Sequence, residues 1–408
     1  MLYDNALLIE ALTHAWQRTG NRLFEERIAE TIDWLKAEMV TADGAFAASL
    51  DADSEGEEGR FYVWHRSEVE SILGDDAGFF CEAYDITADG NWARVSIPNR
   101  SRRPGPHAPE YEARLRACRL RLLAERGRRV RPGLDDKILA DWNGLAIAAI
   151  ARAAAVFAKP EWLDLARNAY AFIRSDMSRD DRLGHAWRAG RLVYPGLSSD
   201  HAAMARAAIA LFETTTEPDY LTDARTWISA LEAHHRAASG GYYLAADDAD
   251  DILVRMLSPA DDAVPNPNAV AADCLVRLWL LTGDDSYRDA ADSILAAFSG
   301  TIASNPTSTL GLVNVLDFLL DPVTVVIVGA LEQRAELRAA CHSLSLWSAV
   351  LFETESTADL PVDHPAHGKQ STDGNAAAFV CRAGTCSLPI ADPADLVAMF
   401  PNLARQPR

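Results

Sequence analysis

The chain has 408 residues, 49% of them hydrophobic, so it can bury a large core, as expected of a globular protein. Its 59 acidic and 39 basic residues give a formal net charge of -20, which opposes attraction to phosphate backbones and argues against nucleic acid as a partner. The six cysteines are mostly isolated, and the start of the chain lacks a basic segment and a cleavage site, so we expect a cytoplasmic protein.

Helical periodicity recurs in four consecutive pairs of segments. The first member of each pair is rich in alanine and apolar almost all round, as in a helix packed on both sides, whereas the second is amphipathic. The junctions within the pairs are short and polar, which predicts antiparallel neighbours. The pairs are residues 5–20 with 22–39, 142–158 with 161–177, 201–215 with 218–237, and 268–283 with 285–300.

The most apolar of these segments, residues 144–158, is too short to cross a bilayer and contains Arg152. We therefore predict a buried helix and no membrane association. The last three pairs start near Trp142, Asp200 and Asn266, a repeat of roughly 60 residues that suits helical hairpins with long loops. A ring of hairpins, an (α/α) barrel with an inner and an outer layer, is the expected closure.

We predict that residues 1–320 form this barrel, with an arginine-rich insert at about 85–135. A helix predicted at residues 110–127 would place some of these arginines on a solvated face, with an anionic-ligand site as the less favoured alternative. After Leu320 the chain changes character, because β-branched or apolar runs at 322–330, 347–354 and 377–389 predict strands. With a helix at 331–344, residues 321–408 are expected to form a small α/β segment.

Polar residues open each predicted inner helix, where the helix ends would gather around one mouth of the barrel. Their simplest role is to cap free backbone N–H groups. Their repetition around one ring also makes them candidate ligand-binding residues, with the acids and the histidine as candidate catalytic groups. The set comprises Tyr3, Asp4, Asn5, Asp136, Lys137, Trp142, Asn143, Asp200, His201, Asn266 and Asn268.

The segment 50–64, LDADSEGEEGRFYVW, combines five acids with three aromatic residues. Its acid spacing resembles a calcium-binding loop, but Tyr62 stands where a bidentate glutamate is required, so no metal is predicted. Simple solvation of the acids is one interpretation. The other is a carbohydrate site over the barrel mouth, with carboxylates for hydrogen bonds or proton transfer and aromatic faces for a sugar ring. Its candidate residues are Asp51, Asp53, Glu55, Tyr62 and Trp64.

Cys381 and Cys386 are spaced unlike the C-x-x-C of redox or zinc sites. A structural or incidental thiol pair is the favoured interpretation, with metal and redox roles as alternatives. The chain carries no glycine-rich phosphate fingerprint after its strands and no G-x-S-x-G, so neither nucleotide binding nor serine hydrolysis is supported, and no cofactor is predicted.

Residues 1–11, 50–64, 134–149 and 379–389 together resemble the YyaL family of thioredoxin-domain-containing proteins, which includes a spermatogenesis-associated mammalian member. The resemblance runs over essentially the whole chain. It implies an N-terminal thioredoxin-like domain followed by an (α/α)6 toroid like that of six-hairpin glycosidases and N-acylglucosamine 2-epimerases. It implies no established activity.

Two features depart from this family pattern. The chain lacks the thioredoxin-like domain and the early barrel segment, so a complete ring of six hairpins would lack at least one helix at its N-terminal edge. A thioredoxin-like partner or a second copy of the chain is expected to cover that edge. The family more often has an aromatic residue where this chain has His201, which weighs against a catalytic role for it.

Two hypotheses for function follow. The first is a carbohydrate-active enzyme, because glycoside hydrolysis needs two carboxyl groups about 5 to 9.5 Å apart, such as Asp51 or Asp53 facing Asp136 or Asp200. Epimerisation would need an acid/base pair, for which His201 is the histidine at an inner helix start. The second hypothesis is a catalytically silent toroid that binds a ligand or a thioredoxin-like partner.

Overall fold

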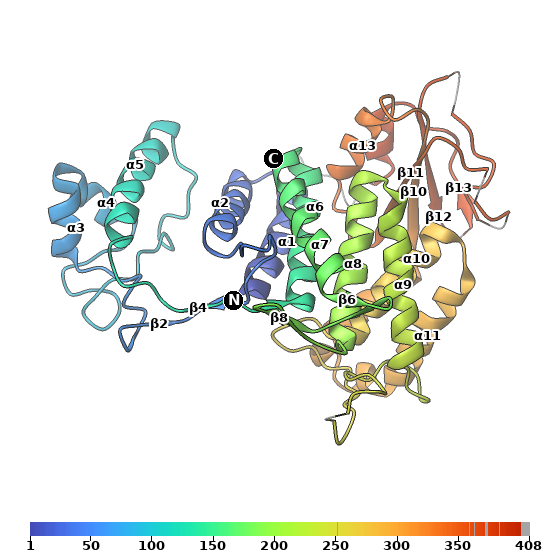
Figure 1. Cartoon of the computed structure of the whole chain (residues 1–408). Helices are drawn as coiled ribbons and strands as arrows, with labels where there is room; N and C mark the ends of the chain where they lie inside the picture. Colours follow the sequence, from blue (N-terminus) through green and yellow to red (C-terminus); the bar gives the residue numbers. More distant parts are fainter. Residues whose placement is uncertain (251, 359, 363, 372–373, 383, 401–408) are drawn as a thin grey trace. The chain divides into compact units, whose positions relative to one another are not determined.

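The computed structural model describes residues 1–250, 252–358, 360–362, 364–371, 374–382 and 384–400 (Figure 1). The chain divides into two compact units. The first comprises Met1–Ala48 and Lys137–Arg408, and the second comprises Ser49–Asp136. The helical hairpins and the C-terminal segment thus belong to the first unit, and the acidic segment 50–64 belongs to the second.

Four helical hairpins form the body of the first unit, as the sequence predicted. Each joins an apolar helix to an amphipathic one through a short turn. The hairpins are α1 (Leu2–Thr19) with α2 (Arg22–Glu38), α6 (Ala140–Phe157) with α7 (Pro160–Asp176), α8 (Ser198–Thr215) with α9 (Pro218–His234), and α10 (Pro267–Thr282) with α11 (Asp285–Ser304). After a 3-10 turn, Pro306–Ser308, a further apolar helix, α12 (Leu310–Leu320), follows.

The apolar helices α1, α6, α8, α10 and α12 form the inner layer, in which each contacts the next in chain order (Figure 1). Close packing within this layer depends on small side chains. A Cβ atom added at Gly144 of α6 would lie 2.6 Å from the backbone carbon of Ala203 on α8. The amphipathic helices pack against the outside of their own partners, so the described residues of this unit form an (α/α) toroid of four hairpins and a fifth inner helix.

After each of the first three outer helices the chain returns to the start of its own inner helix. The N–H of the first residue of the inner helix donates to a carbonyl in this returning segment: Leu2 to Ala48, Ala140 to His185, and Ser198 to Leu244. These contacts repeat at the N-terminal ends of α1, α6 and α8. They hold the loops around one end of the ring.

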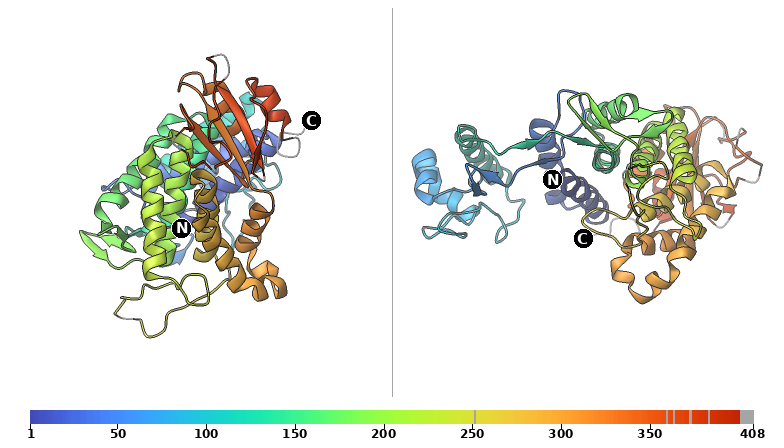
Figure 2. Two further views of the ribbon diagram at one scale, coloured as in Figure 1. Left: turned by 90° about the vertical axis from the view of Figure 1, so that its right-hand side faces the viewer. Right: turned by 60° about the horizontal axis from the view of Figure 1, so that its bottom comes forward.

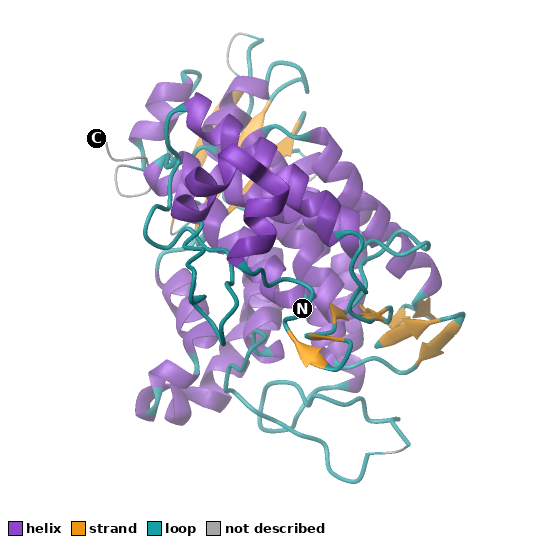
Figure 3. Cartoon of the chain, turned by 90° about the vertical axis from the view of Figure 1, so that its left-hand side faces the viewer, coloured by secondary structure: helices purple, strands orange, loops and turns teal. Residues whose placement is uncertain are grey.

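Short strands organise the same loops. β5 (Ile138–Leu139) pairs with β8 (Ala186–Arg188), which pairs with β9 (Arg191–Val193). β6 (Ser178–Arg179) pairs with β7 (Arg182–Leu183). Figure 3 shows these strands as small elements among the helices.

The C-terminal segment is a small α/β structure, as predicted. Its sheet has the order β11–β10–β12–β13, in which β10 and β11 are parallel and the other pairs antiparallel. Its elements are β10 (Val323–Val328), α13 (Ala335–His342), β11 (Ala349–Thr354), β12 (Ala377–Arg382), β13 (Thr385–Cys386) and α14 (Pro393–Ala398). The sheet lies at the C-terminal ends of α8 and α10, which both contact β11 (Figure 2).

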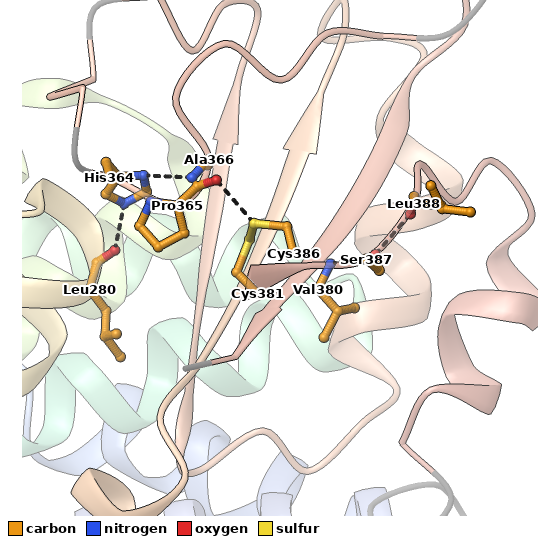
Figure 4. The surroundings of a disulfide bond; sticks show 9 residues. All are labelled: Leu280, His364, Pro365, Ala366, Val380, Cys381, Cys386, Ser387 and Leu388. Carbon is orange, nitrogen blue, oxygen red and sulfur yellow. Dashed lines mark hydrogen bonds between the residues drawn. A yellow bond between two sulfur atoms is a disulfide. The ribbon is translucent and has the colours of Figure 1, made fainter. Parts of the chain in front are cut away.

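Cys381 and Cys386 form a disulfide bond (Figure 4). The bond follows from strand register, because the two residues lie opposite one another in the antiparallel pair β12–β13. The sulfur of Cys386 also contacts the carbonyl of Pro365. Among the described residues, the other four cysteines are free and buried. The pair is therefore a local cross-strand link.

The second unit is helical with a short β-hairpin. It contains β1 (Ser49–Leu50) paired with β4 (Leu134–Asp135), and β2 (Asp53–Ser54) paired with β3 (Glu57–Glu58). Its helices are α3 (Arg66–Leu73), the 3-10 turn Gly74–Asp76, α4 (Ala77–Ala83) and α5 (Pro109–Arg126). The apolar faces of α3, α4 and α5 form its core. Across the described parts of both units, none of the helices combines the length and the apolar character that a membrane span requires.

Candidate functional site

The predicted ligand-binding residues Asn143 and Asn268 each join a loop to the next inner helix. Oδ1 of Asn143 accepts the N–H of Phe46 at 2.9 Å, and Nδ2 donates to the carbonyl of the same residue at 2.9 Å. Asn268 makes the same pair of bonds with Tyr242, at 2.6 and 3.1 Å. Both amides are buried. Each therefore satisfies one backbone N–H and one C=O that the loop leaves unpaired.

His201 occupies the corresponding place on α8. Its Nε2 accepts the N–H of Leu183 at 3.2 Å, and its Nδ1 bonds the carbonyl of Leu197 at 2.9 Å. Burial lowers the pKa of its imidazole, so the ring is neutral at pH 7. We call Asn143, His201 and Asn268 the junction residues. The catalytic role predicted for His201 stays a prediction, and both of its ring nitrogens are engaged in this structural contact.

The other residues predicted at the helix starts have local roles. Asn266 caps α10, since its Oδ1 accepts the N–H of Asn268 at 2.9 Å. Asn5 donates to the carbonyl of Met1 at 2.8 Å, and the Asp4 carboxylate lies 3.2 Å from the Met1 amino group. Lys137, with which the second part of the first unit begins, is exposed.

Tyr3 and Trp142 do come together. Their rings pack edge to face with centroids 4.8 Å apart, so the N-terminal ends of α1 and α6 present an aromatic pair. Tyr3 is buried, and the pKa of its hydroxyl is raised by desolvation and by the charges of Asp4 and Asp262. The loop that carries Asp262 therefore lies near this pair.

Asp200 lies at the centre of a second cluster at the same end of the ring. Its carboxylate is fully buried and accepts the N–H of Asp141 at 3.0 Å and the N–H of Leu197 at 2.7 Å. Nδ1 of His185 lies 3.1 Å from both of its oxygens. The Asp141 carboxylate in turn accepts the hydroxyl of Ser199 at 3.1 Å. Asp200 was predicted as a site residue, whereas neither Asp141 nor His185 was predicted to lie beside it.

Burial and neighbouring charges shift the pKa values of Asp141 and His185. Burial, then the nearby charge of Asp200, raises the pKa of Asp141 to about 6. Burial alone would lower the pKa of His185, but the Asp200 carboxylate outweighs it and raises this pKa to about 9. At pH 7 the histidine is a cation paired with Asp200, and Asp141 titrates close to neutrality.

Asp141, His185 and Asp200 also place one ligand atom each within 4.8 Å of one another, as do His234, Asp247 and Asp248. In the first set a metal would have to displace the proton that His185 shares with Asp200. In the structure, His185 is therefore ion-paired with Asp200.

The acidic segment of the second unit forms a tight hairpin, β2–β3, with Glu55 and Gly56 at positive φ in its turn. Asp51, Asp53 and Glu55 are exposed, and Glu55 pairs with Arg60 at 3.1 Å. This geometry suits the solvated interpretation of the acids. Asp136 is likewise exposed on this unit.

Arginines cover the aromatic residues that follow the hairpin. The guanidinium of Arg129 lies 4.0 Å from the ring centroid of Trp64, and that of Arg126 lies 5.3 Å from the ring of Tyr62. Trp64 is also buried. These rings stack with cations of their own unit, and the predicted role of Tyr62 and Trp64 in sugar binding stays a prediction.

A cavity of about 860 Å³ lies inside the toroid, bounded by all five inner helices. Ionisable side chains from four of them line its wall: Glu10, His14 and Arg18 of α1, Arg152 of α6, Arg206 of α8, and Asp273 and Arg277 of α10. Asp261 and Asp262 line it from the loop before α10, and Ser345 and Trp347 line it from the C-terminal segment. Leu7, Val270 and Val315 add apolar surface.

The charges in this cavity are paired across helices. Oε1 of Glu10 accepts from Arg152 at 3.2 Å and also from Arg206. Burial alone would raise the pKa of Glu10, but the two arginines lower it to about 2. Burial and Arg152 lower the pKa of His14 to about 4, so His14 is neutral at pH 7. The cavity thus holds fixed carboxylates, fixed guanidinium groups and a neutral imidazole.

No protein-family model matches the chain. The chain is similar to spermatogenesis-associated protein 20 from Homo sapiens, with 25% identity, and to an uncharacterized protein from Caenorhabditis elegans, with 23% identity. The alignments cover 97% and 98% of this chain but 57% and 61% of the relatives, so the chain spans less than two thirds of their length. The mammalian similarity expected from the sequence is confirmed, whereas the YyaL name and the thioredoxin-like relation stay predictions.

Among solved structures, the chain is similar to a D-mannose isomerase, with 12% identity, a TM-score of 0.39, and coverage of 74% of this chain and 76% of that chain. An unsaturated glucuronyl hydrolase specific for heparin gives 15% identity, a TM-score of 0.36, and coverage of 73% and 72%. An inactive variant of an α-1,6-mannanase of Salegentibacter sp. HEL1_6 gives 13% identity, a TM-score of 0.34, and coverage of 73% and 70%. The architecture of this chain rests on the contacts between its own helices.

Proposed function

We propose that the toroid binds a carbohydrate in its central cavity. The observation that carries the proposal is the cavity itself: about 860 Å³ of space within the ring, lined by charged side chains from four inner helices. Pockets for small molecules commonly have volumes of about 300 to 1,000 Å³. The space suits a mono- or disaccharide.

The lining favours a polyhydroxylated ligand because it alternates acceptors and donors. Glu10 and Asp273 offer carboxylate oxygens, Arg152 and Arg206 offer N–H groups, and His14 is neutral. A sugar hydroxyl both donates and accepts, so neighbouring hydroxyls can satisfy both kinds of group. The apolar side chains in the wall can contact the C–H faces of a sugar ring.

Within this proposal, the candidate for proton transfer is Asp141 at the N-terminal end of the ring, which is not one of the residues that line the cavity and so would act on a ligand that extends to that end. A pKa of about 6 lets this carboxyl give or take a proton near neutral pH, which is the condition for an efficient acid or base. Asp200 and His185 act as positioning residues for it. Burial and then the charge of Asp200 raise the pKa of Asp141, and His185 bonds the Asp200 carboxylate through Nδ1.

A pair of neighbouring residues on α1 tests the binding proposal. Leu7 lines the cavity, whereas Leu8 is 48% exposed. Leu7→Trp adds an indole to the cavity without disturbing packed core, and Leu8→Trp is the matched control on the surface. Isothermal calorimetry against a panel of mono- and disaccharides should show a sugar that binds the wild type and Leu8→Trp but not Leu7→Trp. Equal binding by both variants would place the sugar outside the cavity.

A further inference from the structure

Two guanidinium groups in the central cavity share one carboxylate. Arg152 of α6 and Arg206 of α8 both donate to Oε1 of Glu10, although the two arginines come from different helices. Glu10 is ionised, with a pKa of about 2. The carboxylate of Asp273 also acts on Arg206, and that of Glu213 on Arg152, so these guanidinium groups are balanced by carboxylates within the cluster.

The arginines differ in how many of their N–H groups are used. Arg277 bonds Asp273 through Nε at 2.8 Å, and its Nη1 and Nη2 bond the carbonyls of Ala349 and Trp347 at 3.1 and 2.8 Å. Arg206 donates to Glu10 through Nη2, and Arg152 donates to Glu10 and contacts His14 through Nη1. A guanidinium has five N–H groups. Among the contacts of the described residues, Arg152 and Arg206 therefore keep donors for the cavity that both line.

The cavity is also polarised along its length. Asp261 and Asp262 lie at its N-terminal end, on the loop that precedes α10. Arg206 is eight residues beyond the start of α8, which places its Cα about 12 Å along the helix at 1.5 Å per residue. The guanidinium groups thus lie farther along the ring than Asp261 and Asp262, at a level that they share with the carboxylates of Glu10 and Asp273.

From this geometry we infer that Arg152 and Arg206 bind the anionic group of a sugar ligand, a carboxylate or a phosphate. The inference rests on the proposed function and narrows its substrate class to sugar acids or sugar phosphates. A guanidinium matches either oxyanion with two parallel N–H···O bonds, and such charge-assisted bonds are stronger than those between neutral groups. The sugar ring then lies between the two arginines and the acidic end of the cavity. Glu10 competes with the ligand anion for the same donors and limits its affinity.

Two substitutions in the group formed by Glu10, Arg152 and Arg206 are expected to change the affinity for anionic sugars in opposite directions. Arg206→Met leaves Glu10 paired with Arg152, so the fold is kept while one anion-binding group is lost. It should weaken the binding of glucuronate and glucose 6-phosphate about tenfold to a hundredfold, the loss of one or two charge-assisted bonds, and leave glucose unchanged. Glu10→Gln removes the competing carboxylate and should tighten both anionic ligands. Arg225→Met, on the outer helix α9, is the matched control and should change neither.

Calorimetry of the full chain with glucose, glucuronate, glucose 6-phosphate and inorganic phosphate separates the outcomes. Preference for an anionic sugar over glucose, lost in Arg206→Met and strengthened in Glu10→Gln, supports the inference, and the preferred ligand identifies the anion. Equal affinities for glucose and both anionic sugars, or a preference that survives Arg206→Met, overturn the inference but leave sugar binding intact. Binding of inorganic phosphate with none of the three sugars overturns both the inference and the proposed function.

Discussion

Removing the side chain of Asn143 should loosen the ring at the junction of its first two hairpins. The substitution Asn143→Ala leaves the N–H and the C=O of Phe46 without their partners at 2.9 Å, in a place where the amide is fully buried. Each buried polar group left unpaired costs about 1 to 3 kcal/mol, so we expect a loss of about 2 to 5 kcal/mol in the free energy of unfolding. Such a loss is a large share of the stability of an ordinary domain.

Asn5 is the matched control, because it is the fourth residue of α1 as Asn143 is of α6. Its amide makes one exposed bond to Met1, so Asn5→Ala should change stability by no more than about 0.5 kcal/mol. The assay is guanidinium unfolding followed by circular dichroism, together with hydrogen exchange of the Phe46 amide as a local probe. Unchanged stability, with the Phe46 amide still protected in Asn143→Ala, would refute the structural role of the junction residues.

The same loss of stability is expected when the side chain of His201 is removed. Asparagine performs the same task at the other two junctions, so His201→Asn should retain most of the stability that His201→Ala loses. The same unfolding assay compares the two variants. Equal losses in the free energy of unfolding would show that an asparagine oxygen cannot replace the imidazole as the acceptor for the N–H of Leu183.

Three further changes should be measurable. Gly144→Ala should destabilise the chain by more than about 1 kcal/mol, because its Cβ would meet the backbone of α8. Gly300→Ala, with open space around it in α11, should stabilise the chain by about 0.5 to 1 kcal/mol. Thermal unfolding compares the two variants. The raised pKa of His185 adds stability that is complete below its unfolded pKa of about 6.5 and is lost as pH rises through 9. Unfolding free energies of the wild type and His185→Gln should therefore converge between pH 6 and pH 10. Reducing the disulfide between Cys381 and Cys386, which closes a short loop, should cost no more than about 2 kcal/mol in denaturant unfolding, and global unfolding on reduction would contradict its local role.

The sequence predicted the layers of the fold because each layer leaves a strong local pattern. The alanine-rich segment around Arg152 had to be buried on both sides, and the amphipathic segment after it had to cover its outside. The strands and the helix after Leu320 were also predictable from β-branched runs and helical periodicity. Both patterns are confirmed by the hairpins and by the C-terminal sheet.

The cluster around Asp200 could not be predicted in the same way. His185 reaches Asp200 because β5 and β8 pair Ile138 with Trp187 and so bring the loop before α8 to the start of α6. That register is a long-range contact with no local sequence signature. Proximity of Asp141 to Asp200 likewise depends on the packing of α6 against α8.

The cavity did leave a signal that can be recognised in retrospect. Arg152, Arg206 and Arg277 each stand within the mainly apolar part of an inner helix, and Glu10 lines the cavity from α1. A charge in a helix packed on both sides must meet a partner or a cavity, because burying it alone is too costly. From the sequence, Arg152 was interpreted only as evidence against a membrane span. The occurrence of an arginine within each of three inner helices also indicates a charged interior.

The most direct test of carbohydrate binding in the toroid is a crystal structure of the chain soaked with the sugar that binds best in calorimetry. We predict density for a sugar ring within the cavity, with its hydroxyls in contact with Glu10 or Asp273 and its anionic group at Arg206. A sugar bound outside the cavity, or a cavity without sugar density at a concentration that saturates binding in solution, would contradict the proposal.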